Sequence, residues 1–177
     1  MLPTMGESGR RTILVVDDEQ AVREALKSIL GREGYSVITA ENGARALQLL
    51  GEDAVDLIIS DQNMPGMSGI DLLKLVRVRH PRVMRVMLTA EPDPQLPVRS
   101  INEGEVYRFI RKPWSNSDLR TIIELAFQVL RLEEEKRRLI SLVRKQRTAW
   151  EQGKSPADPV GLEAELLALA EDEIGNT

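Results

Sequence analysis

Short apolar runs alternate with amphipathic stretches along most of the chain. The runs are rich in Val, Ile and Leu and have no polar face, which is typical of strands covered on both sides in a parallel sheet. Between them, apolar residues recur at helical spacing, for example Val22, Leu26 and Leu30 within residues 20–31. The pattern predicts five strands, at residues 12–16, 35–39, 55–60, 83–88 and 106–110.

The residues at the ends of these stretches support the predicted helices. Asn42 can cap a second helix, and Pro81 closes a third helix over residues 70–79. Several prolines interrupt residues 91–105, so a fourth helix is expected to be short and to begin near Pro97.

Strands that alternate with helices in this way imply right-handed crossovers between parallel strands. The predicted fold class is therefore α/β, with a doubly wound five-stranded parallel sheet. In such sheets, ligands bind where the carboxyl ends of the strands meet.

A longer helical pattern follows the fifth predicted strand. It begins at Ser115 or Ser117 and continues to about residue 152 without Pro or Gly. Apolar residues repeat along it every seven residues, with β-branched side chains prevailing at one seam position and Leu at the other, which favours a parallel two-stranded coiled coil. The seam residues are Ile122, Leu125, Val129, Leu132, Leu139 and Val143.

We therefore expect a homodimer through this C-terminal helix. The first part of the seam is expected to serve the core of the sheet domain as well, which leaves residues 131–152 as the free coiled coil. The alternative is a single amphipathic helix that folds back on its own sheet domain.

Composition excludes several classes of site. The chain has no Cys and a single histidine, His80, which excludes disulfides, thiol catalysis, zinc knuckles and multi-histidine metal sites. The net charge of −4 argues against direct binding of nucleic acid. No apolar run approaches the roughly 18 residues of a membrane helix. We expect a soluble, cytoplasmic protein that inserts into no membrane.

Residues whose side chains could bind a ligand or react lie directly after the predicted strands. Asp17 and Asp18 follow the first strand, Asp61 the third, Thr89 the fourth and Lys112 the fifth. Three clustered carboxylates repel one another and need a cation, and a hard oxygen-only set fits Mg²⁺. The ammonium and the hydroxyl could bind a phosphoryl group, and Asp61 could act as a nucleophile that forms an aspartyl-phosphate.

These five positions, in this order and spacing, resemble the receiver domain of two-component response regulators over about residues 11–130. The resemblance implies a flavodoxin-like fold and a phosphoryl group transferred to Asp61 from a sensor histidine kinase. It also implies that Asp18, Asp61 and the main-chain carbonyl of Asn63 bind Mg²⁺, with Asp17 acting mainly through water.

The resemblance implies roles for further residues. Thr89 and Lys112 would bind the phosphoryl oxygens, and Phe109 would be the aromatic switch residue. Asn63 and Glu91 would tune the rate of dephosphorylation. Such a protein catalyses only its own phosphorylation and dephosphorylation and is otherwise not an enzyme.

The domain organisation follows from these patterns. We expect a flexible leader at 1–11, a receiver domain at 12–130, the coiled-coil helix at 131–152, and a linker with a short acidic amphipathic helix at 153–177. Residues 101–114 resemble receivers joined to larger outputs, such as phosphodiesterases of the HD-GYP kind, so a downstream output domain or protein is a possible partner.

Two other functions stay open at this point. One is a scaffold that dimerises independently of phosphorylation. The other is an aspartyl-phosphate phosphatase, although that class typically carries a second Asp two residues after the nucleophile, where this chain has Asn63.

Overall fold

The computed structural model describes residues 10–90 and 106–151. Glu91, the short helix expected near Pro97 and the segment 153–177 lie outside the described residues, as does nearly all of the predicted leader. The chain divides into two compact units between Gln128 and Val129.

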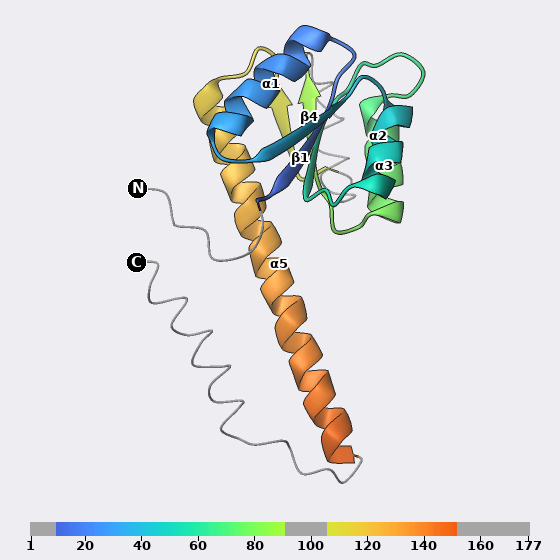
Figure 1. Ribbon diagram of the computed structural model, residues 1–177, viewed down its shortest axis with the longest axis vertical. Coiled ribbons are helices and arrows are strands. Elements are labelled where there is room, and N and C mark those ends of the chain that lie inside the picture. Colours follow the sequence, from blue (N-terminus) through green and yellow to red (C-terminus); the bar gives the residue numbers. More distant parts are fainter. Residues whose placement is uncertain (1–9, 91–105, 152–177) are drawn as a thin grey trace. The chain divides into compact units, whose positions relative to one another are not determined.

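The first unit contains a five-stranded sheet in which all neighbouring strands are parallel, in the order β2-β1-β3-β4-β5 (Figure 1). This order confirms the predicted doubly wound sheet. The middle strands are buried along their whole length or nearly so, because helices cover both faces. The strands are β1 (Thr12–Val16), β2 (Ser36–Ala40), β3 (Leu57–Asp61), β4 (Met84–Thr89) and β5 (Arg108–Arg111).

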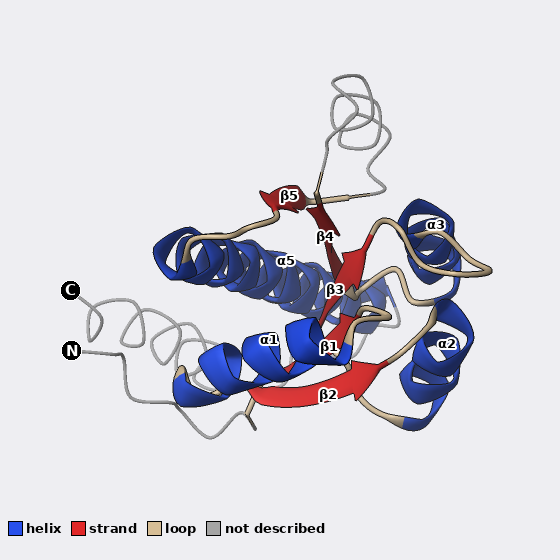
Figure 2. Ribbon diagram, turned by 90° about the horizontal axis from the view of Figure 1, so that it is seen from above, coloured by secondary structure: helices blue, strands red, loops and turns tan. Residues whose placement is uncertain are grey.

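Helices α1 and the first turns of α5 cover one face of the sheet, and α2 and α3 cover the other (Figure 2). Asn42 caps α2 as predicted, since its side-chain oxygen accepts a hydrogen bond from the backbone N–H of Arg45 at 2.8 Å. Ser68 caps α3 in the same way. The helices are α1 (Gln20–Arg32), α2 (Gly43–Glu52), α3 (Gly69–Arg79) and α5 (Asn116–Glu151).

Most predicted elements agree with the structure to within one or two residues. The largest differences are at the starts of the third and fifth strands, which begin at Leu57 and Arg108 and not at residues 55 and 106. Val106 is 2% exposed, so its apolar side chain belongs to the core although its backbone precedes the strand. Val106 is therefore a core residue that lies outside the strand.

Helix α5 is a single uninterrupted helix, as its sequence predicts. Within the first unit, its buried face is formed by Leu119, Ile123, Ala126 and Phe127. Leu125 lies on a neighbouring face and is 45% exposed. The expectation that the first part of the apolar seam also serves the core is therefore wrong for Leu125, because the core contacts a different side of the helix.

In the ranges 10–90 and 106–151, no helix is long and apolar enough to cross a membrane.

Candidate functional site

Asp17 and Asp61 are neighbours because of the sheet register. Val16 at the end of β1 pairs with Ser60 of β3, so the residues that follow them lie side by side at the carboxyl edge. Both carboxylates are buried, with Asp17 fully buried and Asp61 5% exposed. A buried carboxylate needs a charged or hydrogen-bonding partner to offset the loss of water.

Lys112 supplies that partner for both carboxylates. Its Nζ lies 2.7 Å from Oδ2 of Asp17 and 2.6 Å from Oδ1 of Asp61. Lys112 directly follows β5, and its backbone N–H donates to the carbonyl of Thr89 at 2.8 Å. The peptide bond from Lys112 to Pro113 is cis.

The charge of Lys112 is stabilised in this position. Burial alone would lower the pKa of the ammonium, but hydrogen bonds from the ammonium to Asp17 and Asp61 and their negative charges outweigh burial. The pKa of Lys112 is therefore raised above its usual value of 10.5. The lysine remains a cation throughout the neutral range.

The second oxygen of each carboxylate is held by the backbone. The N–H of Glu19 donates to Oδ1 of Asp17 at 2.9 Å, and the N–H of Asn63 donates to Oδ2 of Asp61 at 2.7 Å. These bonds fix the orientation of both carboxylates, which is the condition for a directed nucleophile or ligand.

Gly69 allows the loop after Asp61 to fold tightly. A Cβ at this position would lie 2.0 Å from the carbonyl oxygen of Asp61. The N–H of Gly69 also donates to the carbonyl of Gln62 at 2.9 Å. Any side chain here would displace the backbone that carries Asp61.

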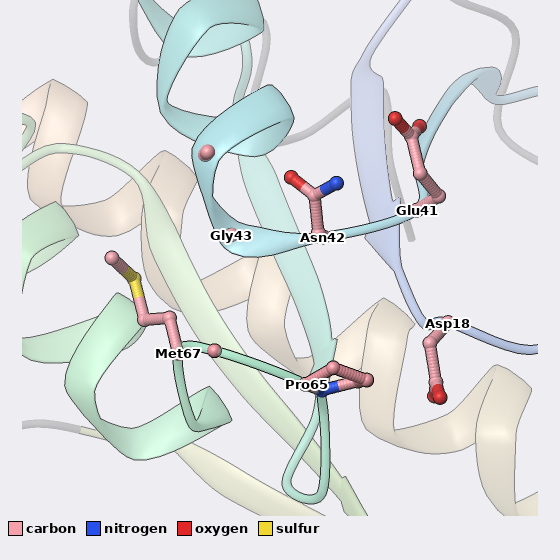
Figure 3. Close-up of a pocket in the computed structure, with 8 residues that line it drawn as sticks. Asp18, Glu41, Asn42, Gly43, Pro65 and Met67 are labelled. Atoms are coloured by element: carbon pink, nitrogen blue, oxygen red, sulfur yellow. The ribbon is translucent and has the colours of Figure 1, made fainter.

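Asp18 is exposed, unlike the other two acids. It lines a pocket of about 480 Å³ between the loops that precede α2 and α3, together with residues such as Asn42, Pro65 and Met67 (Figure 3). Among the residues that the structure describes, no three acidic or histidine side chains are grouped closely enough to hold a metal ion. Since three carboxylates repel one another and Lys112 neutralises only one charge, solvent exposure of Asp18 is physically reasonable.

The donor set nevertheless fits Mg²⁺ chemically. Asp17, Asp18 and Asp61 with Lys112 comprise three carboxylates and one ammonium, which leaves a formal charge of −2. All candidate ligands are oxygens, including the carbonyl of Asn63, and hard divalent cations prefer such ligands.

The remaining predicted residues lie around this group. Thr89 ends β4 and is buried, and it pairs in register with Arg111, the residue before Lys112. Phe109 is partly buried and packs against the core cluster. Asn63 is exposed. The structure thus brings Asp17, Asp61 and Lys112 into direct contact and places Thr89 at the adjacent strand end.

Two features of the site escape the sequence analysis. Arg23 donates hydrogen bonds to the backbone carbonyls of Asp17 and Asp18. Oε1 of Gln62, directly after Asp61, is buried and has no hydrogen-bond partner among the described residues. Backbone acceptors and a buried amide leave no recognisable side-chain pattern, so only the structure reveals these features.

Residues 13–124 match the family model of the response regulator receiver domain. The chain therefore belongs to this family, the receiver domains of two-component response regulators. Among solved structures, it is similar to the signal receiver domain of an HD domain-containing protein from Pseudomonas fluorescens, with a TM-score of 0.69 and 34% identity over 76% of this chain and 98% of that one. It is also similar to the response regulator TrrA from Thermotoga maritima, solved in complex with Mg²⁺ and BeF, with a TM-score of 0.60 and 33% identity over 66% of this chain and 98% of that one.

Among curated relatives, the hydrogenase transcriptional regulatory protein HoxA from Cupriavidus necator is 34% identical over 72% of this chain and 26% of its own length. The DNA-binding transcriptional regulator NtrC from Escherichia coli is 33% identical over 66% of this chain and 25% of its own. A cyclic di-GMP phosphodiesterase from Thermotoga maritima is 34% identical over 66% of this chain and 31% of its own. The chain thus spans about a quarter to a third of the length of these relatives.

Proposed function

We propose that Asp61 accepts a phosphoryl group from a sensor histidine kinase and that this modification switches the protein. The observation that carries the proposal is the position of Asp61. Its carboxylate is buried at the end of β3, with one oxygen held by Lys112 and the other by the N–H of Asn63. A fixed carboxylate beside a permanent cation is suited to attack a phosphoryl group.

In the proposed reaction, one oxygen of Asp61 forms a bond to phosphorus while the bond from phosphorus to the kinase histidine nitrogen breaks. That nitrogen keeps the electron pair and takes up a proton from solvent, so the histidine leaves as a neutral imidazole. Lys112 stays beside the transferred group and stabilises the charge on its oxygens. The hydroxyl of Thr89, at the end of the neighbouring strand, donates to another phosphoryl oxygen.

Mg²⁺ is the proposed cofactor. Asp18, Asp61 and the carbonyl of Asn63 would hold it, with Asp17 contributing through water. When bound, the ion neutralises charge on the phosphoryl oxygens. The oxygen-only donor set and its formal charge of −2 support this assignment.

The transmission of the signal is proposed to run through Thr89 and Phe109, which lie on the adjacent strands β4 and β5. Asn63, two residues after the acceptor, and Glu91, two residues after Thr89, are proposed to tune the lifetime of the phosphoryl group. The exposure of Asn63 supports its access to the attacking water.

We further propose the domain organisation given by the sequence, with a receiver at 12–130 and a dimerising helix at 131–152. The support is the exposure of the seam: Leu132 and Val143 are 66% and 63% exposed, and Leu139 is 39% exposed. Apolar side chains repeated on one face of a helix are covered when two copies pair. A downstream output domain or protein would then respond to the dimer.

The experiment is incubation with acetyl phosphate and Mg²⁺, followed by mass spectrometry of the intact protein. The proposal predicts one phosphoryl adduct that requires Mg²⁺ and is lost in Asp61→Asn. Turnover of many phosphomonoesters without a lasting adduct would indicate a phosphatase. Absence of any adduct would indicate a scaffold that works without phosphorylation.

A further inference from the structure

Arg23 donates hydrogen bonds to the backbone of the acidic loop between β1 and α1. One of its terminal guanidinium nitrogens, Nη1, lies 2.7 Å from the carbonyl oxygen of Asp17 and 3.0 Å from that of Asp18. A terminal guanidinium nitrogen carries two hydrogens, so it can donate to both carbonyls at once. The residue thus ties together two consecutive peptide units.

The geometry follows from the position of Arg23 in the helix. Helix α1 begins at Gln20, and side chains in a helix lean toward its N-terminus. The side chain of Arg23 therefore extends back over the loop that leads into α1. The carbonyls of Asp17 and Asp18 are within its reach.

A cation at this point of the helix interacts unfavourably with the helix dipole. The N-terminus of a helix carries a partial positive charge, and acidic residues are preferred in the first turn. Helix α1 has no acid in its first turn, and its N-cap residue, Glu19, makes no side-chain capping bond. Residues that break a local rule of this kind are expected where function requires them.

The two acids depend on Arg23 to different degrees. Asp17 is also held by Lys112, by the N–H of Glu19 and by its own N–H, which donates to the carbonyl of Ala40 at 3.2 Å. Asp18 is exposed, and within residues 10–90 and 106–151 no other hydrogen bond or ion pair holds it. Arg23 holds the carbonyl before Asp18 and the carbonyl of Asp18 itself, and the N–H of Glu19 holds the other side of the peptide that follows Asp18.

We propose that Arg23 is a positioning residue for the divalent cation, which it serves by holding the peptide of Asp18 in the orientation that cation binding needs. The inference rests on the proposed function, because it assumes that Asp18 is a ligand of Mg²⁺. Arg23 touches no ligand atom of the carboxylate. It acts on the backbone that carries the ligand, as residues behind a metal ligand commonly do.

A positioning role and a purely electrostatic role of Arg23 predict opposite effects of Arg23→Gln on Mg²⁺ affinity. Arg23 is a cation close to an acidic site, so its charge alone repels Mg²⁺, and Arg23→Gln would then strengthen binding. If Arg23 positions Asp18, the same substitution weakens binding. Residues that orient a ligand typically contribute roughly 10- to 100-fold to metal affinity.

The test is calorimetric titration of Mg²⁺ into the full chain and into Arg23→Gln and Lys27→Gln. Lys27 is an exposed cation one turn further along α1 and serves as the matched control for loss of charge. We expect the dissociation constant for Mg²⁺ to be roughly 10- to 100-fold larger for Arg23→Gln. For Lys27→Gln it should be unchanged or slightly smaller. Binding by Arg23→Gln within twofold of the control, or tighter, overturns the inference.

A second variant separates positioning from folding. Arg23→Lys keeps the charge, but its side chain is shorter and places the ammonium less well to donate to both carbonyls. Its affinity should therefore fall between wild type and Arg23→Gln, at an unchanged melting temperature without metal. If Arg23→Lys binds Mg²⁺ as tightly as wild type, two-point contact is not needed and the inference fails. If wild type itself binds no Mg²⁺, it is the proposed metal site that fails.

Discussion

The ammonium of Lys112 lies 2.6 Å from Oδ1 of Asp61, and this contact links the last strand of the sheet to the proposed acceptor on the middle strand. The same ammonium contacts Asp17, so one cation serves two buried carboxylates. Removal of a partner from such a group leaves buried charge uncompensated, which costs far more than the net contribution of the intact pair.

Lys112→Met should therefore destabilise the fold strongly. The expected loss in the free energy of unfolding is about 3–5 kcal/mol, because Asp17 and Asp61 would face each other without a cation. Urea denaturation at pH 7 measures it. Adding Asp61→Asn to Lys112→Met should restore part of the loss, since one of the repelling charges is gone. Strictly additive effects of the two substitutions would contradict the charge explanation.

Stability should decline at high pH because of the same lysine. The pKa of Lys112 is raised in the folded state, so its contribution is fully present below the unfolded value of 10.5 and is lost as pH rises through the higher folded value. Urea denaturation between neutral pH and pH above 10.5 should show a fall that is smaller in Lys112→Met. An equal fall in both proteins would assign the effect to other groups.

Gly69→Ala should damage the site. The new methyl group would meet the carbonyl of Asp61 at 2.0 Å, so the backbone must shift, at a cost of about 3 kcal/mol, the upper end of overpacking effects. Thermal unfolding and the rate of adduct formation should both be affected. Gly51→Ala is the control, because nothing lies within 4 Å of a Cβ there. It should leave phosphorylation unchanged, and equal effects of both substitutions would refute the steric account.

Dimerisation should depend on the exposed seam of α5. Replacing Leu132 and Leu139 by Ser removes two buried layers from the proposed coiled coil, and each side chain contributes roughly 1.5–3 kcal/mol of burial. Sedimentation equilibrium at tens of micromolar should show a dimer for wild type and a monomer for the double variant. Val78→Ser, at an exposed apolar position of α3, should remain dimeric. A monomeric wild type, with or without acetyl phosphate, would exclude the dimer.

Much of the fold could be predicted because apolar runs in a parallel sheet are nearly continuous and end in recognisable residues. The contacts of Asp17, Asp61 and Lys112 could be anticipated for the same reason, since parallel strands bring their carboxyl ends together. Arg23 could not be anticipated, because its partners are backbone carbonyls, which every residue has. The exposure of Leu125 could not be predicted, because heptad spacing does not indicate which side of a helix the core contacts.

The measurement that tests the central claim most directly locates the phosphoryl group. Wild-type protein treated with acetyl phosphate and Mg²⁺ is reduced with borohydride, which converts an aspartyl-phosphate to homoserine, and is then digested and sequenced by mass spectrometry. The account predicts homoserine at position 61 and at no other position, and none when Mg²⁺ is withheld. Homoserine at position 17 or 18, or an unmodified residue 61 after full treatment, would contradict it.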